Sequence, residues 1–170
     1  MSGVALCAGF LGFLAPAAPS NASPSPVPSK SAAAPVFVGP PGWHHVGEND
    51  GLGTWLRPGD TGYSENIVVE AKNGFGSLAA LLQAEVNYIA GLPDQFGYAP
   101  TDATLCGNHP AKYLSYTYTS PSGEPVTAEV VIAVFGTTAY MARYSKTISQ
   151  WADASAERSL TTLCGRAASH

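Results

Sequence analysis

Apolar and polar residues alternate along most of the chain beyond residue 36, and a period of two predicts β-strands. The clearest run is 126–135, where every second residue from Val126 to Val134 is apolar and forms one face. Weaker runs lie at 36–46, 54–57, 65–71, 102–106, 111–119 and 138–145. Short turn-forming segments join several of these runs, which favours antiparallel pairing.

Two segments change to a helical period. Within 77–90 the apolar residues fall on one arc of a helix, and Ser77 is placed to cap its start. A second helix is expected over 150–163, with Ser149 as its cap and Gly165 after its end. The order of elements predicts an α+β fold, an α/β/α sandwich with a central antiparallel sheet of about six strands flanked by two main helices.

The first 35 residues do not fit this domain. Residues 4–15 form an apolar run as long as a signal-peptide core, and Ala15-Pro16-Ala17 suits cleavage, although no basic residue precedes the run. Pro, Ser and Ala dominate the next segment, which cannot form a packed core. We therefore expect a signal peptide at 1–17, a flexible linker at 18–35, a folded domain at 36–165 and a disordered tail at 166–170.

Export follows from this leader, so the mature protein is expected to be secreted or periplasmic, with no transmembrane segment. The net charge is −4, and the eight Lys and Arg residues are scattered along the chain. A nucleic-acid backbone needs a cluster of basic residues, so nucleic acid is not expected as a partner. No motif requires a cofactor, and the expected partner is an unknown protein or small-molecule ligand.

Removal of the leader leaves two cysteines, Cys106 and Cys164. Two cysteines in an exported domain are more often paired than free, which predicts a disulfide between them. Closing such a loop stabilises a fold by about 4 kcal/mol in the chain-entropy treatment. The alternative is two buried thiols that never meet.

Several segments together give a family resemblance. They are Pro41-Gly42-Trp43, the helix 77–90, the turn 106–111, Ala139-Tyr140 with Tyr144, and 159–163. With these segments the chain resembles the PsbP-like superfamily over about residues 36–165. The resemblance implies a sandwich fold and a non-catalytic accessory or binding role, and it supplies no active site that could be transferred to these positions.

Glu85 is the most unusual residue of the first helix, because it falls inside the apolar arc. A carboxylate there must find a partner, reach solvent or have a raised pKa. It is therefore a candidate ligand-binding acid, or else a structural residue that hydrogen-bonds a neighbour. Tyr116 and Tyr118 share a strand face with Lys112, and this stripe either stacks on a ring-shaped ligand or packs under a helix.

Histidines supply the candidate metal ligands, which are His44, His45 and His109. His44 and His45 are adjacent in an extended segment and point to opposite faces, so one ion needs a further ligand from elsewhere. Three functions stay open: a binding or accessory protein, a hydrolase or metal-dependent enzyme centred on Glu85 and the histidines, and a structural module of the cell envelope. The sequence favours the first.

Overall fold

The computed structural model describes residues 35–49, 52–58 and 65–165. The chain divides into two units, Met1–Lys30 and Ser31–His170, and all described residues belong to the second. The expected signal peptide and tail, and the expected linker up to residue 34, lie outside the described residues.

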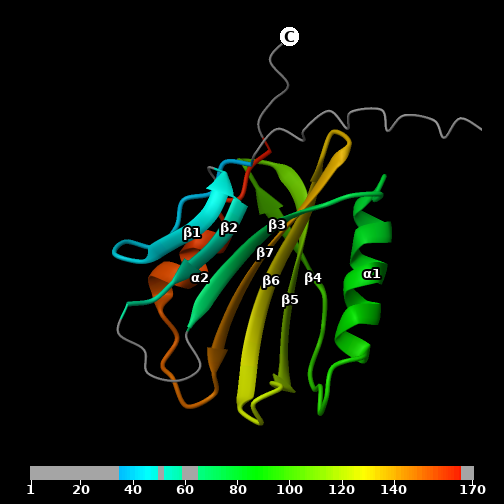
Figure 1. Cartoon of the computed structure of the whole chain (residues 1–170). Helices are drawn as coiled ribbons and strands as arrows, with labels where there is room; N and C mark the ends of the chain where they lie inside the picture. The colour runs from blue at the N-terminus through cyan, green and yellow to red at the C-terminus, as the bar shows by residue number, and fades with distance from the viewer. Residues whose placement is uncertain (1–34, 50–51, 59–64, 166–170) are drawn as a thin grey trace, which may run out of the picture. The chain divides into compact units, whose positions relative to one another are not determined.

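One antiparallel sheet of seven strands forms the centre of this unit, with two helices packed against it (Figure 1). The strands are β1 (His44–Asn49), β2 (Leu52–Leu56), β3 (Asn66–Lys72), β4 (Thr101–Leu105), β5 (His109–Thr119), β6 (Pro125–Phe135) and β7 (Thr138–Thr147). The helices are α1 (Leu78–Ala90) and α2 (Ala154–Leu160). The spatial order is β1-β2-β3-β7-β6-β5-β4, so β7 crosses back to pair with β3 in the middle of the sheet.

The sheet has seven strands, where about six were expected, and its first strand lies at 44–49 and not over the expected run 36–46. Residues 44–49 and 52–56 pair as β1 and β2, with a register shift between Val46 and Asn49. The two strands are short, and each contains a glycine, Gly47 in β1 and Gly53 in β2. A short run interrupted by glycine carries little of the alternation that identifies a strand in a sequence.

Each face of the sheet has its own apolar cluster. Leu81 and Ile89 of α1 pack with Leu114, Val130 and Ile132 of the sheet. On the other face, Ala156 and Leu160 of α2 pack with residues that include Val131, Ala142 and Tyr144. Neighbouring residues of β6 such as Val130 and Val131 thus enter different clusters, because side chains of a strand alternate between faces. The helices therefore lie on opposite faces of the sheet (Figure 1).

Helix α1 forms where the sequence predicts it. The Ser77 hydroxyl accepts a hydrogen bond from the Ala80 amide at 3.2 Å, which caps the first turn. Leu81, Glu85 and Ile89 are its buried residues, spaced four apart along one line of the helix. Among the described helices, none combines the length and apolar character that a membrane crossing requires.

Helix α2 is shorter than expected. It begins after Asp153, whose carboxylate accepts hydrogen bonds from the amide and hydroxyl of Ser155 at 2.8 and 2.6 Å. Ser149 is therefore not the cap, because a carboxylate closer to the apolar stripe takes that role. Gly165 does not follow the helix end directly. It lies against Phe135, and a Cβ added there would come within 2.3 Å of the Phe135 Cβ.

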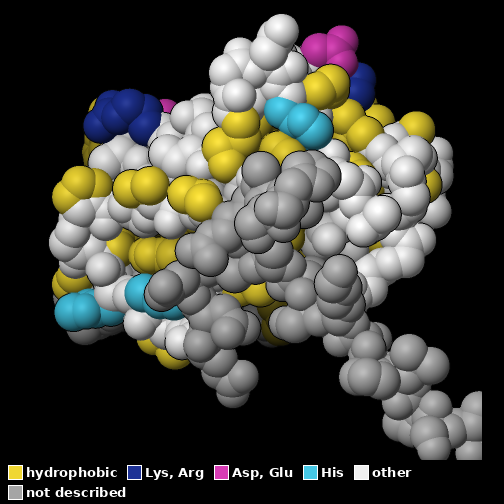
Figure 2. Space-filling model, turned by 90° about the horizontal axis from the view of Figure 1, so that it is seen from above, with side chains coloured by type: hydrophobic (Ala, Val, Ile, Leu, Met, Phe, Trp, Pro, Cys, Tyr) yellow, Lys and Arg dark blue, Asp and Glu magenta, His cyan; other side chains and the backbone are white. Residues whose placement is uncertain are grey.

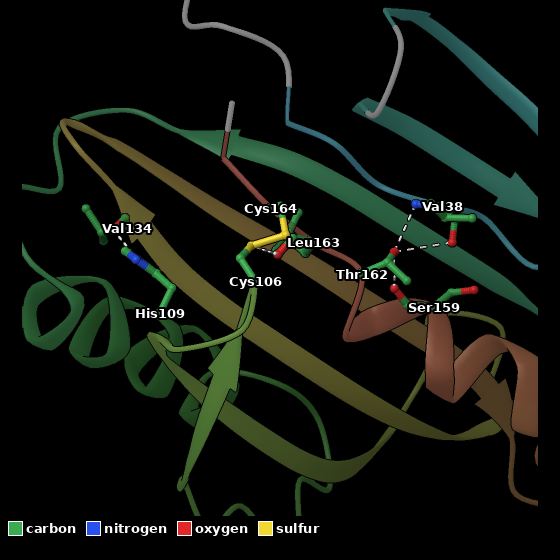
Figure 3. Close-up of a disulfide and its surroundings, with 8 residues drawn as sticks. All are labelled: Val38, Cys106, His109, Val134, Ser159, Thr162, Leu163 and Cys164. Atoms are coloured by element: carbon green, nitrogen blue, oxygen red, sulfur yellow. Dashed lines mark hydrogen bonds between the residues drawn. A yellow bond between two sulfur atoms is a disulfide. The ribbon is translucent and has the colours of Figure 1, made fainter. Parts of the chain in front are cut away.

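A disulfide joins Cys106 to Cys164, and their Cα atoms are 5.7 Å apart (Figure 3). Cys106 follows β4, and Cys164 follows α2. The amide and carbonyl of Val36 exchange hydrogen bonds of 2.7 and 2.8 Å with those of Cys164. The Thr162 hydroxyl accepts a further bond from the Val38 amide at 2.9 Å (Figure 3). The disulfide therefore fixes the segment onto which the start of the domain is paired.

Candidate binding site

A carboxylate and a guanidinium meet between α1 and the sheet. Glu85 lies on the buried side of α1, one turn from both Leu81 and Ile89. Arg143 of β7 faces the same way as Met141, which belongs to the α1 cluster. The Nη2 of Arg143 donates to the Oε1 of Glu85 at 2.8 Å, and only 18% and 7% of the two side chains are exposed. The acid that stands out in the apolar arc is thus neutralised by a specific partner.

Two tyrosines surround this ion pair. The guanidinium of Arg143 lies over the ring of Tyr88, 4.9 Å from the ring centroid, which is a cation–π contact. Tyr116 of β5 is buried, and among the described residues neither its hydroxyl nor the Nε of Arg143 has a hydrogen-bond partner. Burial raises the pKa of the Tyr116 hydroxyl, and the charge of Arg143 acts in the opposite direction. The Tyr116 hydroxyl and the Arg143 Nε can therefore each make a further hydrogen bond, although both lie in an apolar layer.

A cavity of about 280 Å³ opens beside this cluster. Glu70 and Lys72 of β3 form one wall, where their charged groups lie 2.5 Å apart in a second, more exposed ion pair. Phe75, at the entry to α1, and Ala84 supply apolar surface. We call this cavity, with the Glu85–Arg143 pair, the α1 pocket. Its lining carries two carboxylates and two cations, each engaged with an opposite charge.

Among the residues expected to bind a ligand, Glu85 lies in the α1 pocket and the tyrosine stripe does not line it. Tyr116 and Tyr118 have ring centroids 6.0 Å apart, with Tyr116 buried beneath α1, so that ring is not presented to solvent. Lys112 lies farther along β5 and forms an ion pair of 2.7 Å with Asp102 of β4. On β5, Tyr116 and Tyr118 pack in the same apolar cluster as α1.

The three histidines are held apart. His45 stacks on Trp55 with ring centroids 4.4 Å apart, while the adjacent His44 alternates to the opposite face of β1. His109 lies on β5, which four other strands separate from β1 in the sheet, and it donates to the Val134 carbonyl at 2.8 Å (Figure 3). On the face in Figure 2, the visible histidine side chains do not gather into one cluster. Among the described residues, no three His, Cys, Asp or Glu side chains are placed to hold a metal ion.

Sequence reasoning missed Arg143, Tyr88 and the pair of Glu70 and Lys72. For Arg143 a signal exists, because it follows Ala139 and Met141 at alternate positions of a strand and so shares their buried face. A charged residue on a buried strand face and a charged residue in the apolar arc of a helix are natural partners. Nothing in the sequence alone shows that this helix covers this strand.

A second polar network lies on the α2 face. Glu65 is fully buried, accepts a hydrogen bond from the Tyr144 hydroxyl and pairs with Arg57. The Tyr144 oxygen in turn accepts from the Asp153 amide at 3.0 Å, which connects the network to the start of α2. Burial raises the pKa of Tyr144, and the hydrogen bond to Glu65 raises it further. An open depression of about 690 Å³ lies alongside, bordered by Arg57 and the exposed Trp151.

The fold and the α1 pocket define a disulfide-linked α+β domain with one seven-stranded antiparallel sheet. In shape it is similar to LpqN of Mycobacterium tuberculosis, a protein involved in cell envelope biogenesis. The TM-score is 0.56 at 17% identity, covering 80% of this chain and 87% of LpqN. Protein PA94 of Pseudomonas aeruginosa, of unknown function, gives a TM-score of 0.49 at 14% identity, covering 61% of this chain and 74% of that one.

No family model matches the sequence, and no curated protein matches it. Membership of the PsbP-like superfamily is therefore not confirmed. At this level of identity the likeness to LpqN concerns the fold.

Proposed function

We propose that this chain is an extracytoplasmic, non-catalytic binding protein of the cell envelope, built as an α/β/α sandwich and binding its partner at the α1 pocket. The pairing of Glu85 with Arg143 carries the proposal. A carboxylate that acts as a general acid or base must be free to exchange a proton with substrate. Here the Glu85 carboxylate holds the Arg143 guanidinium, and the described residues that line the pocket include no histidine or cysteine.

Two further observations support the location. The disulfide suits an oxidising compartment, because cytosolic thiols are normally kept reduced. The fold shared with LpqN, a protein of cell envelope biogenesis, agrees with an envelope role. Membership of the PsbP-like superfamily, with the accessory role that it implies, belongs to the same proposal.

The test uses the isotope-labelled protein, in the form that its host exports, in heteronuclear NMR. A soluble extract of the host's cell envelope is added, and amide resonances of Ala84, Tyr88 and Arg143 are followed. We expect these resonances to shift. Mass spectrometry of the extract, before and after incubation with the protein, should show that no component has been converted. The variant Ala84→Phe fills the pocket and should abolish the shifts.

The matched control is Ala79→Phe on the exposed side of the same helix, which should leave the shifts unchanged. Shifts confined to another part of the domain would show that the binding site lies elsewhere. Conversion of an extract component by the wild type, lost in Ala84→Phe, would show that the protein is an enzyme.

A further inference from the structure

We infer that the α1 pocket accepts a neutral, hydroxyl-rich ring, that is, a single saccharide unit. This inference rests on the proposed binding function and specifies the chemistry of the ligand. It follows from the way the charges of the pocket are arranged, from its size and from the apolar surface beside those charges. Each of these features excludes other ligand classes.

The charges of the pocket disfavour an ionic ligand. Glu85 is paired with Arg143 at 2.8 Å, and Glu70 with Lys72 at 2.5 Å, so the charges of the described lining residues sum to zero. An anion that approached Arg143 would meet the carboxylate already bound there. A cation that approached Glu85 would meet the guanidinium. Either ion would have to separate a pair, which leaves a poorly solvated charge without its partner.

The same pairs have unused hydrogen-bonding capacity. A carboxylate offers about four acceptor positions and a guanidinium five N–H donors, and one contact between Arg143 and Glu85 uses few of them. The buried Nε of Arg143 has no partner among the described residues. A hydroxyl group both donates and accepts, so neighbouring hydroxyls can bind both members of a pair without separating them. A purely apolar ligand would desolvate these charges without any such compensation.

Size and shape restrict the ligand further. The volume of about 280 Å³ is just below the usual range for ligand pockets, roughly 300–1,000 Å³, which suits one ring and not a chain of rings. Phe75, Leu81 and Ala84 give an apolar wall against which the C–H face of a sugar can pack. One face of the Tyr88 ring is covered by Arg143, so it offers no open aromatic cage for a quaternary ammonium ion.

The experiment titrates the full chain with the methyl glycosides of glucose, galactose and mannose, followed by heteronuclear NMR. Glucuronate and glucosamine serve as the anionic and cationic counterparts. We expect at least one neutral glycoside to shift the amides of Ala84, Tyr88 and Arg143 at millimolar concentration, and both charged sugars to bind at least about tenfold more weakly. Ala84→Phe should abolish these shifts with the ion pair intact, whereas Ala79→Phe should not.

The outcomes separate the two proposals. If the envelope extract shifts the pocket amides and no neutral glycoside does, the saccharide inference is wrong and the binding function stands. Tighter binding of glucuronate or glucosamine than of every neutral glycoside would also overturn the inference. If neither the extract nor any sugar moves these resonances, both proposals fail.

Discussion

Glu85 shows how a charged side chain is accommodated on the buried side of a helix. Its neighbours one turn away, Leu81 and Ile89, are fully or almost fully buried, so the carboxylate has little access to water. Arg143 supplies a charge-assisted hydrogen bond, and the guanidinium is itself held over the Tyr88 ring. Glu85 thus positions Arg143, and Arg143 contacts Tyr88, so that the polar groups of the pocket are held in fixed positions.

Replacing Glu85 with Gln should therefore destabilise the protein. Gln keeps a hydrogen-bond acceptor but removes the negative charge, so the mostly buried Arg143 loses its counter-ion. We expect the free energy of unfolding to fall by about 1–3 kcal/mol, measured by urea denaturation. Glu70→Gln is the matched control, because the Glu70–Lys72 pair is more exposed, and it should cost less than about 1 kcal/mol. A Glu85→Gln variant as stable as wild type would show that the pair contributes nothing.

At the residue scale, the sequence showed that Glu85 is an unusual residue of α1 but did not show that Arg143 pairs with it. Glu85 is conspicuous from its helical position alone, because the apolar arc depends only on local spacing. Arg143 lies 58 residues later, and its role depends on how α1 lies across the sheet. That placement is a tertiary property, and neither local propensity nor periodicity contains it.

At the scale of elements, prediction succeeded where one periodic pattern runs long enough. The alternation from Val126 to Val134 corresponds to β6, and the cap at Ser77 starts α1 as expected. The start of α2 was misplaced, because 150–153 contains no strong helix signal and two acceptable caps compete there. Ser149 and Asp153 both suit the position by residue type. Packing of Ala156 and Leu160 against the sheet decides in favour of Asp153.

The cap of α2 predicts a dependence of stability on pH. Burial alone would raise the pKa of Asp153, but hydrogen bonds from the hydroxyl and amide of Ser155 outweigh it and lower the pKa below the usual 3.8. Because the carboxylate is favoured in the folded state, its contribution is complete above about pH 4 and is lost as the pH falls through the folded-state pKa. Asp153→Asn should therefore be less stable than wild type at neutral pH, with a smaller difference in acid.

Urea denaturation at neutral pH and at about pH 3 measures that difference. Asn is also a good helix cap, so the substitution isolates the charge from the capping geometry. Ser155→Ala removes the hydroxyl donor to Asp153 and should reduce the pH-dependent part of the difference. A gap between wild type and Asp153→Asn that grows towards acid pH would contradict the assignment.

At the scale of the whole described unit, the two faces of the sheet carry different structural features. The α1 face carries the Glu85–Arg143 pair and the pocket, while the α2 face carries the disulfide-linked segment onto which the start of the domain pairs. Val36 joins that segment through two backbone hydrogen bonds to Cys164. Loss of the disulfide should therefore weaken the backbone pairing of Val36 with Cys164, while α1 stays folded on the sheet.

The double variant Cys106→Ser/Cys164→Ser tests this division. The bond closes a loop with a sequence separation of 58, so its removal should lower the free energy of unfolding by about 4 kcal/mol. Hydrogen exchange should then show faster exchange at the Val36 and Cys164 amides than within α1, because local opening costs least where few contacts remain. Reduction of the wild type should reproduce both effects. Equal stability with and without the bond, or equal loss of protection in α1 and at Val36, would show that the disulfide does not hold the domain start in place.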